Sequence, residues 1–270
     1  MKLNKLGLIT IVAAMWTLNV YAEHAPHSPQ LEQINVQEVF VPEVGYDNND
    51  NVQVLVDGKL PNLCYDLDKT TSSIDMDKKI ITITQYARKK SDSICDLDRR
   101  DLPEYMKYPV RYSQDYNLGQ LHSGKYKIVF SQQKKLNKSR PLEIKKAPVS
   151  SVDNFIYAPI SSAFIPEIIY ETNDAQVVLT GIMGSTCLKF SKIDVITMND
   201  VYIILPKLTY NGNVECQNQP RPIQKIISLG KVEPGRYLIH IRSTSGKAIN
   251  KVFSVTKRAE TGNYSSYFDQ

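Results

Sequence analysis

The sequence predicts an all-β protein made of two tandem, homologous β-sandwich domains, each with one internal disulfide. Three observations lead to this prediction. The chain repeats itself at an offset of about 124 residues, short β-branched runs alternate with turn residues, and each repeat contains two cysteines. Self-similarity at a fixed offset is the sequence signature of a duplicated structural unit. We therefore expect domains at residues 23–148 and 149–270, after a leader at 1–22.

The repeat consists of many matches in the same order along the chain. Residues 40–44 (FVPEV) return as 164–168 (FIPEI), and 118–126 (LGQLHSGKY) return as 229–237 (LGKVEPGRY). Residues that both copies share are most simply explained by a shared fold. Functional residues are therefore sought where the two copies differ.

The cysteines of the chain fall in pairs, one pair in each repeat. An even number of cysteines in an exported chain indicates disulfides rather than metal ligands. The repeat selects among the three possible connectivities and predicts the bridges Cys64–Cys95 and Cys187–Cys216. A bridge that closes a loop of this length stabilises its domain by about 3–4 kcal/mol in the chain-entropy model.

Runs of β-branched and aromatic residues, separated by glycine-containing turns, predict the strands. In the first copy the predicted strands are 52–56, 79–86, 126–130 and 142–145, and in the second 176–180, 201–205, 237–242 and 251–256. No stretch of the mature chain has helical periodicity. Short strands in units of this length favour a β-sandwich.

A glycine turn followed by a Tyr-x-Ile strand, as in residues 235–239 (GRYLI), resembles immunoglobulin-like domains in general. The resemblance implies a sandwich of two β-sheets in each copy. The buried tryptophan and the Cys…Trp…Cys spacing of antibody domains are absent from the sequence.

The N-terminus has the three parts of a secretory signal peptide. A lysine-containing start precedes an apolar run at residues 6–16, and Val20 and Ala22 supply the small residues that a signal peptidase reads. The apolar run is shorter than the roughly 20 residues that span a bilayer. We expect cleavage before Glu23, no transmembrane segment in the mature chain, and a periplasmic or secreted location. An uncleaved N-terminal anchor is the alternative.

The charge of the mature chain excludes a nucleic-acid-binding protein. Loss of Lys2 and Lys5 with the leader lowers the formal charge from +5 to about +3, without a concentrated basic face. No motif predicts a cofactor.

Catalysis is not expected, because histidine, the usual acid–base group near neutral pH, is scarce. The four histidines are His24 and His27 near the mature N-terminus, His122 in a predicted turn and His240 in a predicted strand. None recurs in the other copy, and both cysteine pairs are assigned to bridges. For His240 we expect a strand residue with a satisfied hydrogen-bond partner.

A metal site is not expected either. The acids of the first copy are spaced in Asp-x-Asp pairs but lack the central glycine and closing glutamate of a calcium loop. We interpret them as solvated loop charges: Asp47, Asp50, Asp66, Asp68, Asp75 and Asp77.

The candidate binding surface is an insertion in the first copy, between its second cysteine and the Leu-Gly turn. It mixes arginines with tyrosines, which supply large contact areas and directional donors at protein interfaces. Its candidate binding residues are Arg99, Arg100, Tyr105, Lys107, Tyr108, Arg111 and Tyr112, with Tyr116 also in the interval. An elaborated loop without a partner is the alternative.

Two further segments are weaker candidates. A basic cluster of Lys134, Lys135, Lys138 and Arg140 is expected at a hairpin tip, either solvated or against anionic lipid or polysaccharide. The tail at 263–270 contains Tyr264, Tyr267 and Phe268, and fraying is the expected behaviour there.

The sequence thus favours a non-catalytic binding or interaction protein of the bacterial cell envelope, contacting a protein or polysaccharide partner mainly through residues 97–116. The alternative is a structural subunit or assembly factor of an envelope complex. Fimbrial chaperones are one such class, but their motifs are not found here. A hydrolase acting on cell-wall polymer is a third, less favoured interpretation.

Overall fold

The computed structural model describes residues 31–258, except residues 44, 133, 134, 149, 152, 154, 213 and 214. The predicted signal peptide, His24, His27 and the tail at 263–270 lie outside the described residues. Within them the protein is all-β, as predicted. The only helical elements described are short 3₁₀ turns, namely η1 (Ser93–Asp96), η2 (Glu104–Met106) and η3 (Thr244–Gly246).

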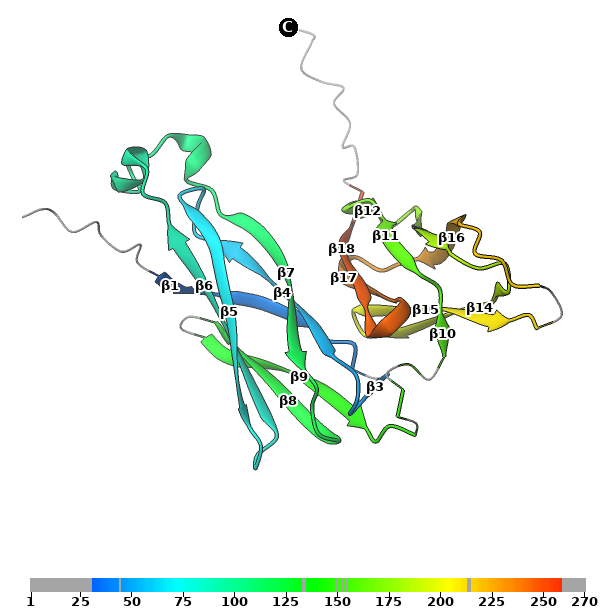
Figure 1. Ribbon diagram of the computed structural model, residues 1–270. Coiled ribbons are helices and arrows are strands. Elements are labelled where there is room, and N and C mark those ends of the chain that lie inside the picture. Colours follow the sequence, from blue (N-terminus) through cyan, green and yellow to red (C-terminus); the bar gives the residue numbers. More distant parts are fainter. Residues whose placement is uncertain are drawn as a thin grey trace, which may run out of the picture.

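The first unit, as we call strands β1–β9, contains two facing sheets (Figure 1). The larger sheet has the order β1-β6-β8-β9-β3, with β5 beside β6: β1 (Leu31–Ile34), β3 (Tyr46–Asp47), β5 (Tyr65–Asp75), β6 (Ile80–Lys89), β8 (Gly124–Gln132) and β9 (Lys135–Lys145). The smaller sheet has the order β2-β4-β7: β2 (Val36–Phe40), β4 (Val52–Leu60) and β7 (Val110–Gly119).

The second unit, strands β10–β18, has the same strand order. Its larger sheet runs β10-β15-β17-β18-β12, with β14 beside β15: β10 (Ile156–Tyr157), β12 (Ile168–Tyr170), β14 (Leu188–Met198), β15 (Val201–Tyr210), β17 (Gly235–Arg242) and β18 (Ala248–Thr256). Its smaller sheet runs β11-β13-β16: β11 (Ile160–Phe164), β13 (Asp174–Met183) and β16 (Arg221–Lys231). Even the parallel pairs correspond, since β6 pairs with β8 as β15 pairs with β17.

Each unit has its own hydrophobic core between its two sheets. In the first unit Val54 of the smaller sheet and Ile83 and Phe130 of the larger sheet belong to one buried cluster. In the second unit Leu179 and Phe253 belong to a separate cluster. The inward positions alternate along the strands, because successive side chains of a strand point to opposite faces.

Both predicted disulfides are confirmed. Cys64 is bonded to Cys95 and Cys187 to Cys216, so each bridge stays within its own unit. The bridges are compatible with an oxidising, extracytoplasmic compartment. The domain boundary placed after residue 148 stays a prediction. The sheets of the first unit end at Lys145, and those of the second begin at Ile156.

The eight predicted strands are all present, and several are longer than expected. The short strands β1, β2, β3 and β12 were not predicted. Strands β5, β7, β14 and β16 were not predicted either, because charged and polar residues interrupt their apolar alternation. The interpretation as solvated loop charges is wrong for Asp66, Asp68 and Asp75, which lie in β5. It is also wrong for Asp47, which lies in β3, and for Asp50, which is buried. Asp66 pairs with Lys90, and Asp68 with Arg88 across the β5–β6 pairing.

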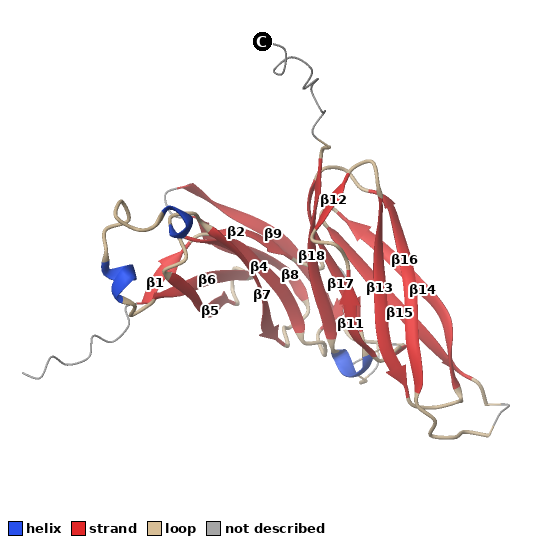
Figure 2. Cartoon of the chain, turned by 90° about the horizontal axis from the view of Figure 1, so that it is seen from above, coloured by secondary structure: helices blue, strands red, loops and turns tan. Residues whose placement is uncertain are grey.

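The two units pack against each other through unlike faces. The outer face of the first unit's smaller sheet, with Phe40 and Leu55, meets the outer face of the second unit's larger sheet, with Val201, Ile203 and Leu238. Figures 1 and 2 show the second unit lying beside strands β2, β4 and β7. Strands β15 and β17 are therefore buried on both faces over part of their length.

Candidate functional site

The predicted insertion forms an ordered cap at the end of the first unit that is remote from the second unit (Figures 1 and 2). The cap, residues 91–109, carries η1 and η2 between β6 and β7. Leu102 and Met106 pack on the Cys64–Cys95 bridge in a small core of their own. The Leu63 amide donates to the Met106 carbonyl, which ties the cap to the β4–β5 turn. The disulfide thus serves as the base of the cap.

The polar side chains of the cap mostly pair within it. Arg100 bonds to Asp98, Lys107 forms an ion pair with Glu104, and Arg99 donates to the Lys107 carbonyl. The Arg100 hydrogen bonds lower the pKa of the Asp98 carboxyl. These pairs are exposed, so each contributes little to stability.

The tyrosines of the cap point into solvent. Tyr105 is 67% exposed and Tyr108 60% exposed. The Tyr108 hydroxyl donates to Glu104 at 3.0 Å, which orients its ring. Leu63 and Leu97 are exposed at the same end of the unit. The cap therefore presents exposed aromatic side chains on a backbone that is held by the Cys64–Cys95 bridge and the Leu63–Met106 hydrogen bond.

The remaining insertion residues lie elsewhere, in strand β7. Tyr112 is buried in the first core, and its hydroxyl donates to the Asn35 carbonyl, so this ring is not available to a partner. Arg111 points to the other side of β7, towards Asp57. The tyrosines and arginines of the insertion therefore lie in three different environments: the exposed cap, the core of the first unit, and the side of β7 that faces Asp57.

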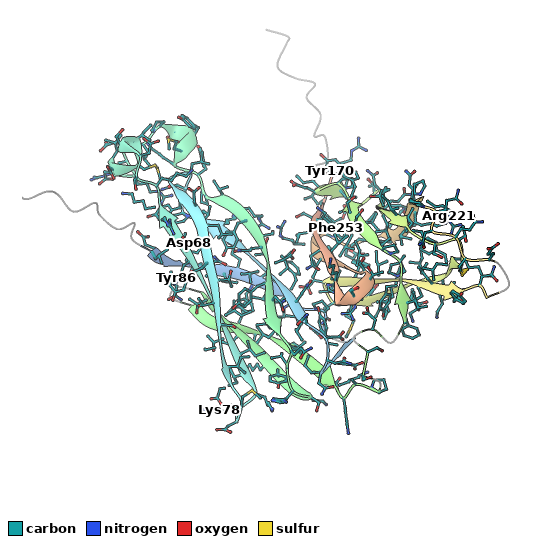
Figure 3. The ribbon with its side chains drawn as sticks, in the orientation of Figure 1. Asp68, Lys78, Tyr86, Tyr170, Arg221 and Phe253 are labelled. Carbon is teal, nitrogen blue, oxygen red and sulfur yellow. A yellow bond between two sulfur atoms is a disulfide. The ribbon has the colours of Figure 1, made fainter. Side chains whose placement is uncertain are left out.

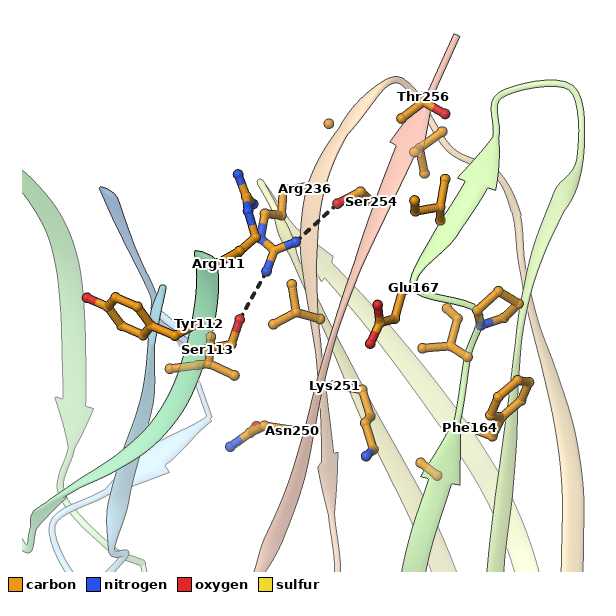
Figure 4. Close-up of a pocket in the computed structure, with 18 of the residues that line it drawn as sticks. Arg111, Tyr112, Ser113, Phe164, Glu167, Arg236, Asn250, Lys251, Ser254 and Thr256 are labelled. Atoms are coloured by element: carbon orange, nitrogen blue, oxygen red, sulfur yellow. Dashed lines mark hydrogen bonds between the residues drawn. The ribbon is translucent and has the colours of Figure 1, made fainter. Parts of the chain in front are cut away.

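Arg111 belongs to a cleft between the two units, which has a volume of about 1150 Å³. One wall is β7 with Ser113 and Asp115. The other wall contains β18 and the segment from Phe164 to Ile168, as Figure 4 shows. The cleft is larger than a typical small-molecule pocket.

Arg236, which lines this cleft, forms an ion pair between the units. Its Nε donates to Asp57 at 3.0 Å, and its terminal nitrogens donate to Ser113 and Ser254 (Figure 4). Asp57 is buried in β4 and also accepts from the Ser113 hydroxyl. Asp115 accepts from Asn250, and burial raises the pKa of the Asp115 carboxyl.

A second inter-unit ion pair is more deeply buried. Arg242 of β17 donates to Asp50 at 2.8 Å and to Asp153 at 3.4 Å. Its guanidinium also lies over the rings of Tyr46 and Tyr157. Burial raises the pKa of the Tyr46 hydroxyl above its usual range, so this tyrosine is neutral.

His240 lies beside this pair and is buried, with its ring edge against Tyr46. Its Nδ1 is 2.8 Å from the Asn250 side-chain oxygen, so His240 has the expected hydrogen-bond partner. Burial lowers the pKa of the imidazole to about 4. His240 is therefore a neutral interior residue at physiological pH.

The predicted basic cluster at the β8–β9 hairpin is only partly a solvated tip. Lys134 lies outside the described residues, and the Lys135 side chain is not described. Arg140 is half-buried, bonds to Glu38 at 3.1 Å and also bonds to Asp200 of the second unit. Arg140 is thus a third ionic link between the units, contrary to the prediction of a solvated or lipid-contacting turn. Lys138 forms an ion pair with Glu38.

Comparison of the chain with protein-family models, with curated proteins and with solved structures finds no match. Nowhere in residues 31–258, as far as they are described, does a helix have the length and apolarity needed to cross a membrane. Among those same residues, histidines, cysteines and carboxylates do not gather in groups of three or more that would suit a metal ion.

The surfaces between the units were not predicted from the sequence. Arg236 stands in residues 229–237, a segment that both copies share, and such segments were assigned to the fold alone. Its partner Asp57 directly follows the predicted strand 52–56. One signal was present. Residues 201–205 (VYIIL) form a continuous apolar run, which is typical of a strand buried on both faces.

Proposed function

We propose that this protein is an exported, non-catalytic binding protein of the bacterial cell envelope, periplasmic or secreted, that contacts its partner through the cap. The observation that carries the proposal is the exposure of Tyr105 and Tyr108 on a base fixed by a disulfide. A tyrosine side chain has few rotatable bonds and therefore loses little entropy on binding, and tyrosine is enriched among residues that dominate interface energies.

The proposed partner is a protein or a polysaccharide. Leu97 and Leu63 add exposed apolar side chains at this end of the unit, and the cap also carries the paired charges of Arg100 and Lys107. An apolar centre within a polar rim is the usual anatomy of a contact surface. The same tyrosine rings are suited to stacking on sugar faces.

We also propose that each unit is a variant of the immunoglobulin-like sandwich. Tyr126 donates its hydroxyl to the His122 carbonyl, and Tyr237 does the same to the Glu233 carbonyl. A hydroxyl bonded to the backbone a few residues upstream is a feature of that fold. The parallel β6–β8 pairing departs from its antiparallel sheets, so the proposed variant has a different connectivity.

The binding proposal is tested with the variant Tyr105→Ala/Tyr108→Ala. The matched control is Tyr170→Ala, which removes an exposed tyrosine from β12 of the second unit, far from the cap (Figure 3). The mature protein is crosslinked in a native envelope fraction and incubated separately with purified envelope polysaccharide. Loss of about 30-fold in affinity, confined to the cap variant, is expected for two anchor residues. Equal recovery by both variants would contradict a role of the cap.

A catalytic role is not part of the proposal, because His240 is buried and its Nδ1 is bonded to Asn250.

The alternative function, a structural subunit or assembly factor, is favoured by one observation: a sheet face of the second unit is apolar and exposed. Size-exclusion chromatography of an envelope extract separates the two functions, since a structural subunit elutes in a large complex.

A further inference from the structure

The two units carry the same surface in two different states. Phe40 in β2 and Phe164 in β11 occupy equivalent positions, each in register with an apolar residue of the next strand. Phe40 is 1% exposed, because Val201, Ile203 and Leu238 of the second unit cover it. Phe164 is 66% exposed. The face that docks a neighbour in the first unit is thus uncovered in the second.

This uncovered face is a continuous apolar row across three strands. Phe164 of β11 is in register with Val178 of β13, and Val178 is in register with Ile226 of β16. Ile226 and Ile182 are each 63% exposed. We call the outward side of β11, β13 and β16 the second-unit face.

The second-unit face differs from its counterpart in charge. In the first unit the equivalent row ends at Asp115, and Asp57 stands in the next row, where it pairs with Arg236. In the second unit the neighbouring row is Ser162, Thr180 and Gln224, which are polar but uncharged. The second-unit face therefore suits an uncharged surface rather than a cationic one.

The packing between the units could in principle be repeated between two chains. The second-unit face of one chain would then be covered by the larger sheet of the first unit of another chain. The register that places Leu238 beside Val201 places Lys127 beside Ile80 in the first unit. Lys127 is exposed, so covering the second-unit face in this way would bury a lysine against Phe164 and Ile226 without a partner. A head-to-tail assembly is therefore disfavoured.

We propose that the occupant is the same face of a second copy, which gives a symmetric dimer. Two copies of one uncharged apolar row are self-complementary about a two-fold axis, as the interface of a C₂ dimer requires. Face-to-face packing of two sheets also reproduces the packing inside each unit. The apolar row contains only three side chains, so we expect a concentration-dependent dimer rather than the permanent kind that larger apolar interfaces form.

The test is sedimentation velocity of the full mature chain over a wide concentration range. The disrupting variant is Ile226→Lys, which places two like charges in the dimer interface. Leu97→Lys is the matched control, because Leu97 is exposed on the cap. We expect wild type and Leu97→Lys to shift from monomer to dimer with rising concentration, and Ile226→Lys to remain monomeric with an unchanged circular dichroism spectrum.

A second measurement keeps the proposal testable if Ile226→Lys fails to fold. All four native cysteines are in disulfides, so Ile226→Cys carries a single free thiol. A short bis-maleimide should crosslink this variant into dimers, whereas Leu97→Cys should remain monomeric. A wild-type chain that is monomeric throughout, a dimer that survives Ile226→Lys, or an open-ended series of larger species would each overturn the symmetric dimer.

Discussion

Arg242 in β17 of the second unit donates a hydrogen bond to Asp50 of the first unit at 2.8 Å, and both side chains are buried. Two aromatic rings, Tyr46 and Tyr157, lie against the guanidinium. A buried ion pair tolerates few alternative geometries, because each partner that moves leaves an uncompensated charge. The pair therefore fixes how the two units are oriented.

Replacement of Arg242 by alanine should destabilise the protein by about 3–5 kcal/mol, since the buried Asp50 would lose its counter-charge and keep only the hydrogen bond from the Asp47 amide. The measurement is the free energy of unfolding in urea. Arg100→Ala is the control, because its pair with Asp98 is exposed, and a change near zero is expected there. The double variant Arg242→Met/Asp50→Leu should recover most of the loss. A large loss in Arg100→Ala, or none in Arg242→Ala, would contradict this account.

Stability should fall on acidification because of His240. Its folded-state pKa is about 4, below the usual value of 6.5, so the unfolded chain binds a proton that the folded chain does not. The stabilising contribution is complete above pH 6.5, is lost as pH falls towards 4, and amounts to about 3 kcal/mol. Unfolding free energies of wild type and His240→Gln are compared across this window. His122→Gln, at an exposed position, should keep the wild-type slope.

Gly181 is needed because another backbone segment passes directly over it. A Cβ at this position would collide with the Pro159 carbonyl oxygen, which cannot move as a side chain could. Gly181→Ala should cost about 1–3 kcal/mol or more through this overpacking. Gly184→Ala is the control, since a Cβ there would meet open space. Thermal unfolding of the two variants should differ clearly, and equal melting temperatures would show that β11 shifts without cost.

The two disulfides should contribute similar stability but different local order. Serine replacement of either pair removes a loop constraint of about 3–4 kcal/mol in the chain-entropy model. Loss of Cys64–Cys95 should also loosen the cap, because Leu102 and Met106 pack on that bridge. Limited proteolysis should then cleave within residues 91–109 before any other segment. Early cleavage in the Cys187/Cys216 variant at the same site would refute this assignment.

Much of the architecture could be predicted because the chain contains its own comparison. The matched segments 40–44 and 164–168, with 118–126 and 229–237, revealed the repeat, and the repeat assigned both bridges correctly. Strand β5 could not be predicted from apolar alternation. It lies at the edge of its sheet beside β6, and polar residues occupy positions that face the smaller sheet, where Thr70 donates to Gln114 and Ser72 accepts from Tyr116.

The candidate site was harder to predict than the fold. Composition alone placed Tyr112 with Tyr105 and Tyr108, although one ring is in the core and the other two are in solvent. Residues of opposite charge that meet between the units, such as Arg140 and Asp200, are distant in the chain. The sequence around Arg140 or Asp200 gives no indication of the partner. The two residues meet because the smaller sheet of the first unit packs against the larger sheet of the second.

Strands β15 and β17 carry apolar side chains on both faces. The second unit therefore depends more than the first on its neighbour to keep apolar side chains out of water. If the two units were separated, the second unit would expose three apolar side chains, Val201, Ile203 and Leu238. The first unit would expose chiefly Phe40 and Leu55. During synthesis the first unit is made before the second and exposes little apolar surface in the meantime. When the second unit is made, the first unit is already present to cover its apolar strands.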